Sequence, residues 1–329
     1  MIFALAITGP TASGKTSLSL ALAEKLGAEI ISCDSMQIYK GMDIGTAKAT
    51  AEERARVPHH LVDFLSPADT YSAEEYRVDA IKSAKDITNR GRLPIFVGGT
   101  GLYIDTVMRS PLQNVPESDP EYRDKILQEI QTDDDLTRLW ERLQSVDPES
   151  AEKIHKNNVR RVIRALEIYD KTGKPKSVID RERTSLRSEV FVGMITLDFI
   201  NRELLYERID RRVDIMMEEG LLAEVELLYK EGLLENGTAS QAIGYKELTQ
   251  YIENNCSLDE AVEKIKLSSR RYAKRQLTWF RHEEGARVIY LDRPSGEMKN
   301  ADELLSEALE IVSELRSEYE MEVRKENEG

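Results

Sequence analysis

Short runs rich in hydrophobic residues recur along the chain, and such runs are typical of strands in a parallel sheet that is covered on both faces. Each run gives way to Gly-containing or polar residues, which end a strand and begin a loop. The runs cover residues 2–8, 28–32, 93–97, 188–198 and 286–292. The sequence therefore predicts five strands, of which those at 2–8, 28–32 and 93–97 are expected to be buried on both faces.

Between these runs, hydrophobic residues spaced three and four apart predict amphipathic helices. The first helix directly follows a Gly-containing stretch at residues 9–14. A strand, a Gly-rich loop, a helix and a second strand form the start of a parallel sheet with helices on both faces. Outside the stretch discussed next, the predicted helices cover residues 16–27, 71–91, 100–108, 201–220, 221–231, 244–252, 258–283 and 301–320.

The pattern changes at about residue 111, where the Pro-containing stretch SPLQNVPESDP begins. From Pro120 to about Lys171 the spacing predicts helices only, and residues 171–180 are expected to be an irregular, polar exit. The strand at 188–198 then resumes the sheet. We predict an α/β core formed by residues 1–111 and 186–329, with an all-helical insertion domain at 112–185.

Composition indicates an ordinary soluble protein, with 40% hydrophobic and 32% charged residues in a chain of 329. No apolar run approaches the roughly 20 residues of a membrane span, so no membrane partner is expected. Two cysteines, Cys33 and Cys256, cannot form a disulfide framework, and the four histidines have no zinc-ligand spacing. A cytoplasmic location is the expectation.

The net charge of −14 argues weakly against a nucleic-acid partner, but the charge is unevenly distributed. Residues 301–329 contain ten acidic and three basic residues. Residues 153–183 and 264–287 are each net +6. These two stretches are either solvated helix faces or contacts for a polyanion, and charge alone does not separate the two interpretations.

Residues 9–16, GPTASGKT, fit the phosphate-binding pattern G-x-x-x-x-G-K-[ST]. In that pattern, loop N–H groups and the N-terminus of the following helix surround an anion, and a lysine, here Lys15, adds a full charge. The hydroxyl of Thr16 would ligate Mg²⁺. The sequence therefore predicts a P-loop NTPase-like fold with a diphosphate or triphosphate site, the alternative being a Gly-rich turn without a ligand.

Two further segments lie at the predicted carboxyl ends of strands, where open α/β sheets bind ligands. Asp34 follows the strand at 28–32, and it is a helix cap, an outer partner of Mg²⁺ or a general base. Thr100, in GGTGLY, follows the strand at 93–97 and either caps a helix or offers its hydroxyl to the site. Periodicity does not choose between these roles.

Missing motifs narrow the classes of P-loop protein. The guanine-binding motif N-K-x-D is absent, which disfavours a GTPase switch. No strand ends in an obvious acidic residue for the metal of an ATPase, because IFVGGT has Gly at that point. A P-loop kinase of a nucleoside or small metabolite remains open.

Seven segments together resemble the tRNA dimethylallyltransferases, also called tRNA isopentenyltransferases, of bacterial type. In order they are GPTASGKT, DSMQIYKGMDIGTAK, PHHLVD, LPIFVGGTGLY, RRVIRALEIY, QAIGYKEL and KRQLTWFR, and they extend from the first strand to Arg281. The resemblance implies a monomeric tRNA-modifying transferase that uses Mg²⁺. It would move a dimethylallyl group from dimethylallyl diphosphate to N6 of adenosine 37, beside the anticodon.

The resemblance also implies roles for individual residues. The diphosphate of the prenyl donor would be held by Gly9, Pro10, Thr11, Ala12, Ser13, Gly14, Lys15, Thr16 and Arg212, with Thr16 on the metal. The catalytic group would be Asp34 as general base, with Thr100, Lys15 and Arg212. Contacts with the tRNA anticodon stem-loop would come from Ser35, Met36, Gln37, Ile38, Arg123, Asn157, Asn158, Arg160, Arg161, Arg164, Lys274 and Arg275.

Several finer expectations accompany these roles. Lys156 is expected to share a helix face with Arg160, Arg161 and Arg164, and Arg281 to join the phosphate contacts. Gln37 is expected to bond a base edge. Trp279 and Phe280 are expected in the core. Two rival hypotheses remain, a small-metabolite kinase and a non-catalytic RNA-binding protein with a relic P-loop.

Overall fold

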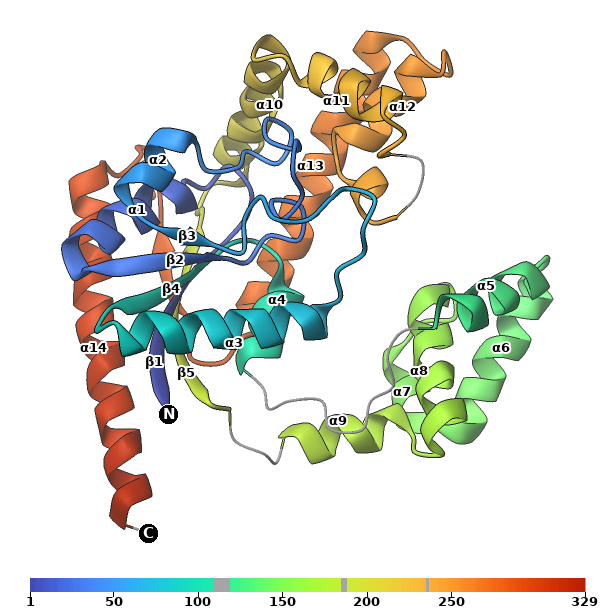
Figure 1. The fold of residues 1–329 in the computed structure, drawn as a ribbon, viewed down its shortest axis with the longest axis horizontal. Helices are drawn as coiled ribbons and strands as arrows, with labels where there is room; N and C mark the ends of the chain where they lie inside the picture. The colour runs from blue at the N-terminus through green and yellow to red at the C-terminus, as the bar shows by residue number, and fades with distance from the viewer. Residues whose placement is uncertain (109–118, 185–187, 235–236, 329) are drawn as a thin grey trace. The chain divides into compact units, whose positions relative to one another are not determined.

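Figure 1 shows the computed structural model, which describes residues 1–108, 119–184, 188–234 and 237–328. The chain divides into two compact units, which are described separately below. Unit 1 comprises Met1–Met108 and Glu189–Gly329, and unit 2 comprises Arg109–Ser188. The predicted boundaries of the insertion, at 111/112 and 185/186, lie outside the described residues.

Unit 1 contains a six-stranded sheet in the order β3-β2-β4-β1-β5-β6, and every pairing is parallel. The strands are β1 (Ile2–Thr8), β2 (Ala28–Ser32), β3 (His59–His60), β4 (Leu93–Val97), β5 (Val190–Asp198) and β6 (Arg287–Tyr290). The five apolar runs predicted all of them except β3. That strand has two residues, pairs only with Ile30 and Ile31, and is too short for a periodic pattern.

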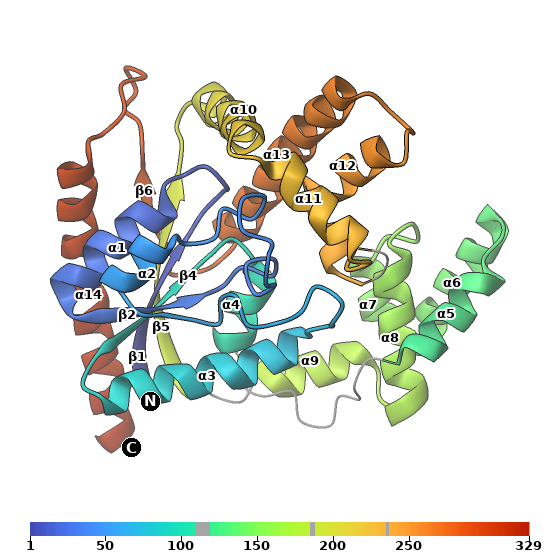
Figure 2. The same cartoon turned by 45° about the horizontal axis from the view of Figure 1, so that its top comes forward.

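Helices cover both faces of the sheet because successive residues of β1 point to opposite sides. Leu5 and Ile7 pack with α1 (Lys15–Leu26) and α14 (Ala301–Glu328). Ala4 and Ala6 pack with α3 (Ala73–Asn89) and α4 (Gly101–Met108). Figure 2 shows the two layers, with α1 and α14 on one side of the strands and α3 on the other. These observations confirm the predicted α/β class.

A third core lies beyond the carboxyl ends of the strands, where α10 (Arg202–Glu218), α11 (Leu221–Lys230), α12 (Tyr245–Ile252) and α13 (Leu258–Arg281) pack around residues 38–42. Helix α13 joins this core to the sheet, since Ile265 lies in the third core and Leu277 in the first. Phe280 is buried in the second core, and Trp279 packs against it. The expectation that both aromatic residues belong to the core is confirmed.

Unit 2 is helical throughout its described residues. Its helices are α5 (Pro120–Glu129), α6 (Asp133–Val146), α7 (Pro148–Lys153), α8 (Val159–Thr172) and α9 (Lys176–Thr184). They enclose a small core that includes Leu143, Val162 and Leu166. Gly173, in the left-handed region at φ 69°, ends α8.

Three local expectations were wrong. The segment at 171–180 is not an irregular exit, because α9 begins at Lys176. Helix α14 continues to Glu328, whereas the sequence suggested an end at residue 320. A short helix, α2 (Ala51–Arg56), was missed although Thr50 and Glu53 form a capping box around its first turn. Among the described helices, none combines the length and the apolar character that crossing a bilayer requires.

Candidate active site

The loop between β1 and α1 forms a tight cradle at the helix N-terminus. Gly9 has φ 134°, and a Cβ there would lie 2.6 Å from the carbonyl oxygen of Leu197, so only glycine fits. Gly14, at φ 82°, turns the chain into α1 and carries no side chain to cap it. The first N–H groups of α1 therefore stay available for an anion, as the motif predicts.

Lys15 begins α1, and its side chain folds back over the loop. The ammonium Nζ donates to the carbonyl oxygens of Gly9 at 3.0 Å and Pro10 at 2.7 Å. Burial, and to a smaller extent the nearby charge of Arg212, lower the pKa of Lys15 to about 7, although the charge of Asp34 opposes both effects. A bound polyanion would reverse this shift by supplying the missing negative charge.

Ser13 adds a second indication that the cradle receives a ligand. Its hydroxyl Oγ is buried and, within the described residues, has no hydrogen-bond partner. An unsatisfied buried hydroxyl costs free energy unless a ligand, ion or water completes it. The Ser13 hydroxyl therefore indicates that the cradle binds a polar group of a ligand.

Helix α10 supplies the arginine side of the site. Arg212 is half-buried and lines the same cavity as Asp34, whereas Arg211 is exposed, so the cavity arginine is Arg212. Burial lowers the pKa of the Arg212 guanidinium, and Asp34 opposes that shift. One turn earlier, Arg208 donates from Nε to the carbonyl oxygen of Ala12 at 3.0 Å, which ties α10 to the cradle.

Asp34 and Thr100 come together although they follow different strands. The Oδ1 atom of Asp34 accepts a hydrogen bond from the N–H of Met36 at 2.9 Å. The Oγ1 atom of Thr100 accepts one from the N–H of Ser35 at 3.1 Å. Close approach of the two loops requires Gly98, where a Cβ would lie 2.3 Å from the carbonyl oxygen of Cys33. Thr100 therefore braces the segment that carries Asp34.

These elements surround a cavity of about 260 Å³ in unit 1. Its polar lining includes Thr11, Asp34, Ser35, Arg212 and Tyr272. Burial raises the pKa of the Tyr272 phenol, and the adjacent Asp34 charge adds to that effect, so the hydroxyl stays protonated. The apolar lining comes from the third core and includes Val213, Met216, Leu221, Ile243 and Ile265. The cavity thus pairs an anion-binding end with an apolar wall.

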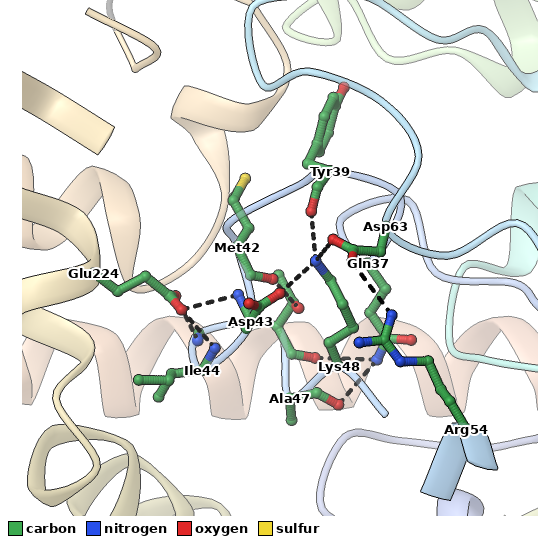
Figure 3. Close-up of polar contacts among 12 residues, drawn as sticks. Gln37, Tyr39, Met42, Asp43, Ile44, Ala47, Lys48, Arg54, Asp63 and Glu224 are labelled. Carbon is green, nitrogen blue, oxygen red and sulfur yellow. Dashed lines mark hydrogen bonds and ion pairs between the residues drawn. The ribbon is translucent and has the colours of Figure 1, made fainter. Parts of the chain in front are cut away.

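Two charged side chains hold residues 39–48 beside the cavity (Figure 3). Lys48 is buried, and its Nζ reaches the carbonyl oxygen of Tyr39 at 2.6 Å, Asp43 at 2.5 Å and Asp63 at 2.8 Å. Glu224 of α11 accepts hydrogen bonds from the N–H groups of Asp43 at 2.9 Å, Ile44 at 2.8 Å and Gly45 at 3.2 Å. Sequence reasoning missed both residues: the N–H partners of Glu224 are backbone groups far along the chain, and the sequence does not reveal which carboxylates a lysine pairs with.

The segment after Asp34 contains the predicted base contacts, and the structure separates them. Ser35 and Met36 line the cavity. Gln37 uses its amide internally, donating from Nε2 to the carbonyl oxygens of Thr46 at 3.1 Å and Ala47 at 3.2 Å. The side chain of Ile38 is 1% exposed inside the third core. Ile38 therefore offers no side-chain surface to a tRNA, and Gln37 shapes the loop.

Helix α13 carries the second basic stretch. Lys274 and Arg275 are exposed, and Arg275 lines the cavity with its guanidinium 5.6 Å from the ring centre of Tyr272. Arg281 instead donates from Nη2 to the carboxylate of Asp198 at 2.6 Å, and that carboxylate is almost fully buried. The charge of Arg281 therefore satisfies the buried carboxylate of Asp198, and the expected phosphate contact of Arg281 stays a prediction.

In unit 2, some of the residues predicted to contact tRNA are exposed, and others form ion pairs within the unit. Asn157, Asn158, Arg160 and Arg161 are exposed around the start of α8. Arg123 and Arg164 both donate to the buried carboxylate of Glu167, at 2.8 and 2.7 Å. Lys156 precedes α8 and pairs with Asp133 at 3.1 Å, so it does not share the helix face. Arg123 and Arg164 hold the unit together whatever else they contact.

One further residue that the sequence analysis missed lies between the two glycine-containing loops. Gln276 of α13 is 5% exposed. Its Oε1 accepts from the N–H of Thr11 at 2.9 Å, and its Nε2 donates to the carbonyl oxygen of Gly99 at 2.9 Å. It was quoted only as part of KRQLTWFR, and a polar residue on a helix does not reveal its partners.

Comparisons with known proteins agree with this geometry. Residues 37–283 match the IPP transferase family, and residues 2–63 match the isopentenyl transferase family. A tRNA dimethylallyltransferase of Thermoanaerobacter sp. (strain X514) is 45% identical over 308 residues, which cover 93% of this chain and 96% of that protein. One from Geobacillus thermodenitrificans is 52% identical over 279 residues, covering 84% and 87%.

Solved structures of tRNA-modifying prenyl transferases are also similar to this chain. The full-length tRNA isopentenylpyrophosphate transferase of Bacillus halodurans has a TM-score of 0.72 and 40% identity, over 98% of this chain and 99% of that one. A eukaryotic dimethylallyltransferase acting on tRNA has a TM-score of 0.72 and 33% identity, over 85% and 70%.

Proposed function

Because the chain belongs to the tRNA dimethylallyltransferase family, we propose that it transfers a dimethylallyl group from dimethylallyl diphosphate to N6 of adenosine 37 in tRNA. One observation carries this assignment: Asp34 and Arg212 face one cavity that adjoins the anion cradle and has an apolar wall. A kinase of a small metabolite needs the cradle but has no use for a prenyl-sized apolar wall beside a carboxylate. The names of the relatives reported above support transfer of a dimethylallyl group to tRNA.

The cradle would hold the diphosphate as a leaving group. When the C1–O bond of the donor breaks, its electron pair goes to the diphosphate, which gains charge. Loop N–H groups, Lys15 and Arg212 would stabilise that charge in a sheltered site. Lys15 must first release the carbonyl oxygens of Gly9 and Pro10, and the arriving anion provides the stronger partner.

Asp34 would take the proton from the acceptor. The lone pair of N6 is delocalised into adenine, so removal of its proton helps it attack C1 of the donor. The N–H of Met36 holds Oδ1, and in the described residues this leaves Oδ2 as the oxygen for the proton. Adenosine 37 must also leave its stack to reach the cavity, which costs a few kcal/mol.

Mg²⁺ fits this site. Among the described residues, no three His, Cys, Asp or Glu side chains gather to hold a metal. Mg²⁺ needs no such cage, because it keeps waters and binds substrate phosphate oxygens with one or two protein ligands. The hydroxyls of Thr16, in the first turn of α1, and of Ser13, which has no hydrogen-bond partner among the described residues, are suitable ligands beside a diphosphate. The ion would supply positive charge to the leaving group.

The exposed basic residues would contact phosphates of the tRNA anticodon stem-loop. They are Arg160 and Arg161 in unit 2 and Lys274 and Arg275 on α13. Ser35 and Met36, at the cavity, would lie next to the acceptor base. A monomer acting in the cytoplasm is sufficient for this chemistry, because each chain carries the cradle, the carboxylate and the basic residues.

Incubation with labelled dimethylallyl diphosphate, Mg²⁺ and unmodified tRNA tests the proposal. We expect label in the tRNA, and none when adenosine 37 is replaced by guanosine. ATP serves as the rival donor in a parallel reaction. Turnover of ATP without label in RNA would favour a kinase, and tRNA binding without either reaction would favour a non-catalytic RNA-binding protein.

A further inference from the structure

Gln276 joins the two loops that carry the two halves of the site. Its carboxamide lies between Thr11, in the phosphate cradle, and Gly99, in the loop that leads to Thr100. Both hydrogen bonds measure 2.9 Å, and the side chain is buried. Only one orientation of the amide satisfies both partners, since Thr11 N–H needs an acceptor and the Gly99 carbonyl needs a donor.

Each of these two hydrogen bonds is formed by a loop that carries a proposed catalytic residue. Thr11 lies four residues before Lys15, on the arm of the loop that would hold the leaving diphosphate. Gly99 precedes Thr100, whose Oγ1 accepts from the N–H of Ser35 at 3.1 Å. Ser35 is the neighbour of Asp34. Gln276 therefore connects the donor side to the acceptor side through two short paths of covalent and hydrogen bonds.

The space around Gly99 is shaped for this carboxamide. A Cβ at Gly99 would lie 1.9 Å from Nε2 of Gln276, whereas the nearest atom outside Gln276 is the carbonyl oxygen of Gly9 at 3.6 Å. The φ of Gly99 is not in the left-handed region, so an L-residue is sterically excluded there only by Gln276. A Cβ at Gly101 would similarly lie 2.4 Å from the ring of Trp279, so glycine there makes room for that ring.

We propose that Gln276 is a positioning residue that fixes the distance between the diphosphate cradle and the Asp34–Thr100 side of the site. The proposal rests on the proposed function, because it assigns the two loops to donor and acceptor. A carboxamide meets both requirements, since its oxygen accepts from the N–H of Thr11 while its NH₂ group donates to the carbonyl oxygen of Gly99. Loss of the connection lets the loops drift apart while each still binds its own ligand.

The decisive variants are Gln276→Glu, Gln276→Ala and Gly99→Ala. Gln276→Glu keeps the shape and the acceptor for Thr11, but a carboxylate cannot donate to the Gly99 carbonyl. Gly99→Ala displaces the carboxamide without altering Gln276. We expect each variant to lower kcat on the order of 10- to 100-fold, the penalty of a misplacement near 1 Å. Kd values for dimethylallyl diphosphate and for tRNA, measured separately, should change less than about threefold.

Combining the changes tests whether they act on one contact. Gln276→Ala removes the group that Gly99→Ala displaces, so the double variant should lose no more kcat than the worse single variant. Losses that multiply in the double variant would overturn the proposal. So would a kcat for Gln276→Glu within about twofold of the wild type. Thr278→Ala is the control, since Thr278 is exposed on the same helix and bonds the carbonyl oxygen of Lys274.

Amide hydrogen exchange supplies a readout that needs no substrate. The N–H of Thr11 should exchange faster in Gln276→Ala and Gly99→Ala than in the wild type, with Thr278→Ala unchanged; equal protection in all four would overturn the contact itself. Wild-type protein that fails to label tRNA would instead reject the proposed function. Wild-type activity with fully active Gln276 variants would reject only the positioning role.

Discussion

At the scale of single residues, the two oxygens of Asp34 have different surroundings, and this difference makes its role testable. Oδ1 accepts the N–H of Met36, and an asparagine at this position would preserve that bond. Asp34→Asn should therefore keep the loop and remove only the base, lowering kcat on the order of 10²- to 10⁴-fold. Tritium- or carbon-labelled donor gives kcat, and filter binding gives the Kd for tRNA. Equal losses in kcat and in tRNA affinity would contradict a general base.

Lys15 gives donor binding a pH dependence with a predictable sign. Its pKa is about 7 in the ligand-free cradle, so the ammonium loses its proton as the pH rises above neutrality. A diphosphate favours the protonated form, so binding above pH 7 must take up a proton and weaken as the pH rises. The same depressed pKa makes the buried ammonium unfavourable for folding below pH 7, a cost that is relieved as the pH rises toward 10.5.

Calorimetric titration of dimethylallyl diphosphate between pH 7.5 and 9, where the diphosphate itself stays ionised, measures this effect. We expect Kd to rise with pH in the wild type and to stay nearly constant in Lys15→Arg, because guanidinium does not titrate in that range. If log Kd depended on pH equally in both proteins, Lys15 would not be the group that takes up the proton.

At the scale of elements, α11 controls a loop far from it in sequence. Glu224 accepts three backbone N–H groups of residues 43–45, and Gly45 and Thr46 line the cavity. Glu224→Gln replaces an acceptor oxygen by an NH₂ group that faces those donors. We expect the free energy of unfolding to fall by about 1 kcal/mol, the net contribution of a typical hydrogen bond, and the KM for tRNA to rise.

Denaturant unfolding and steady-state kinetics check this prediction. Glu226→Gln is the matched control, because Glu226 is exposed on the same helix. If both variants lose the same stability, or if Glu224→Gln leaves the KM for tRNA unchanged, α11 does not position the loop.

The elements also show which features of the fold and of the site can be predicted from the sequence. Runs rich in apolar residues predicted five strands because most strand residues pack between the two helix layers, and the cradle was visible because its backbone geometry demands Gly9 and Gly14. The contacts of Glu224 and Gln276 were not visible. Their partners are N–H and C=O groups that every residue carries, placed 181 residues from Glu224 and 265 from Gln276 by the fold alone.

At the scale of the whole molecule, a net charge of −14 coexists with exposed arginines in each unit. Arg160 and Arg161 are exposed at the start of α8, and we propose that they meet phosphates of the tRNA. Changing both to Ala should weaken tRNA binding and lower the slope of log K against log salt concentration by about 1 for each lost contact.

A salt titration of tRNA affinity measures that slope. Arg138→Ala is the control in the same unit, since Arg138 is exposed and its charge is already paired with Asp135 at 2.5 Å. An unchanged slope in the Arg160→Ala, Arg161→Ala variant would show that these residues do not contact phosphates.

The central claim is that the cradle at residues 9–16 holds a leaving diphosphate and transfers no phosphoryl group. The most direct measurement follows both products in one reaction, by phosphorus NMR of the released anion and mass spectrometry of the tRNA nucleosides. We predict one intact diphosphate for each dimethylallyl group found on N6 of adenosine 37, with ATP neither consumed nor required. Release of orthophosphate, consumption of ATP, or a phosphorylated product without prenylated tRNA would contradict this account.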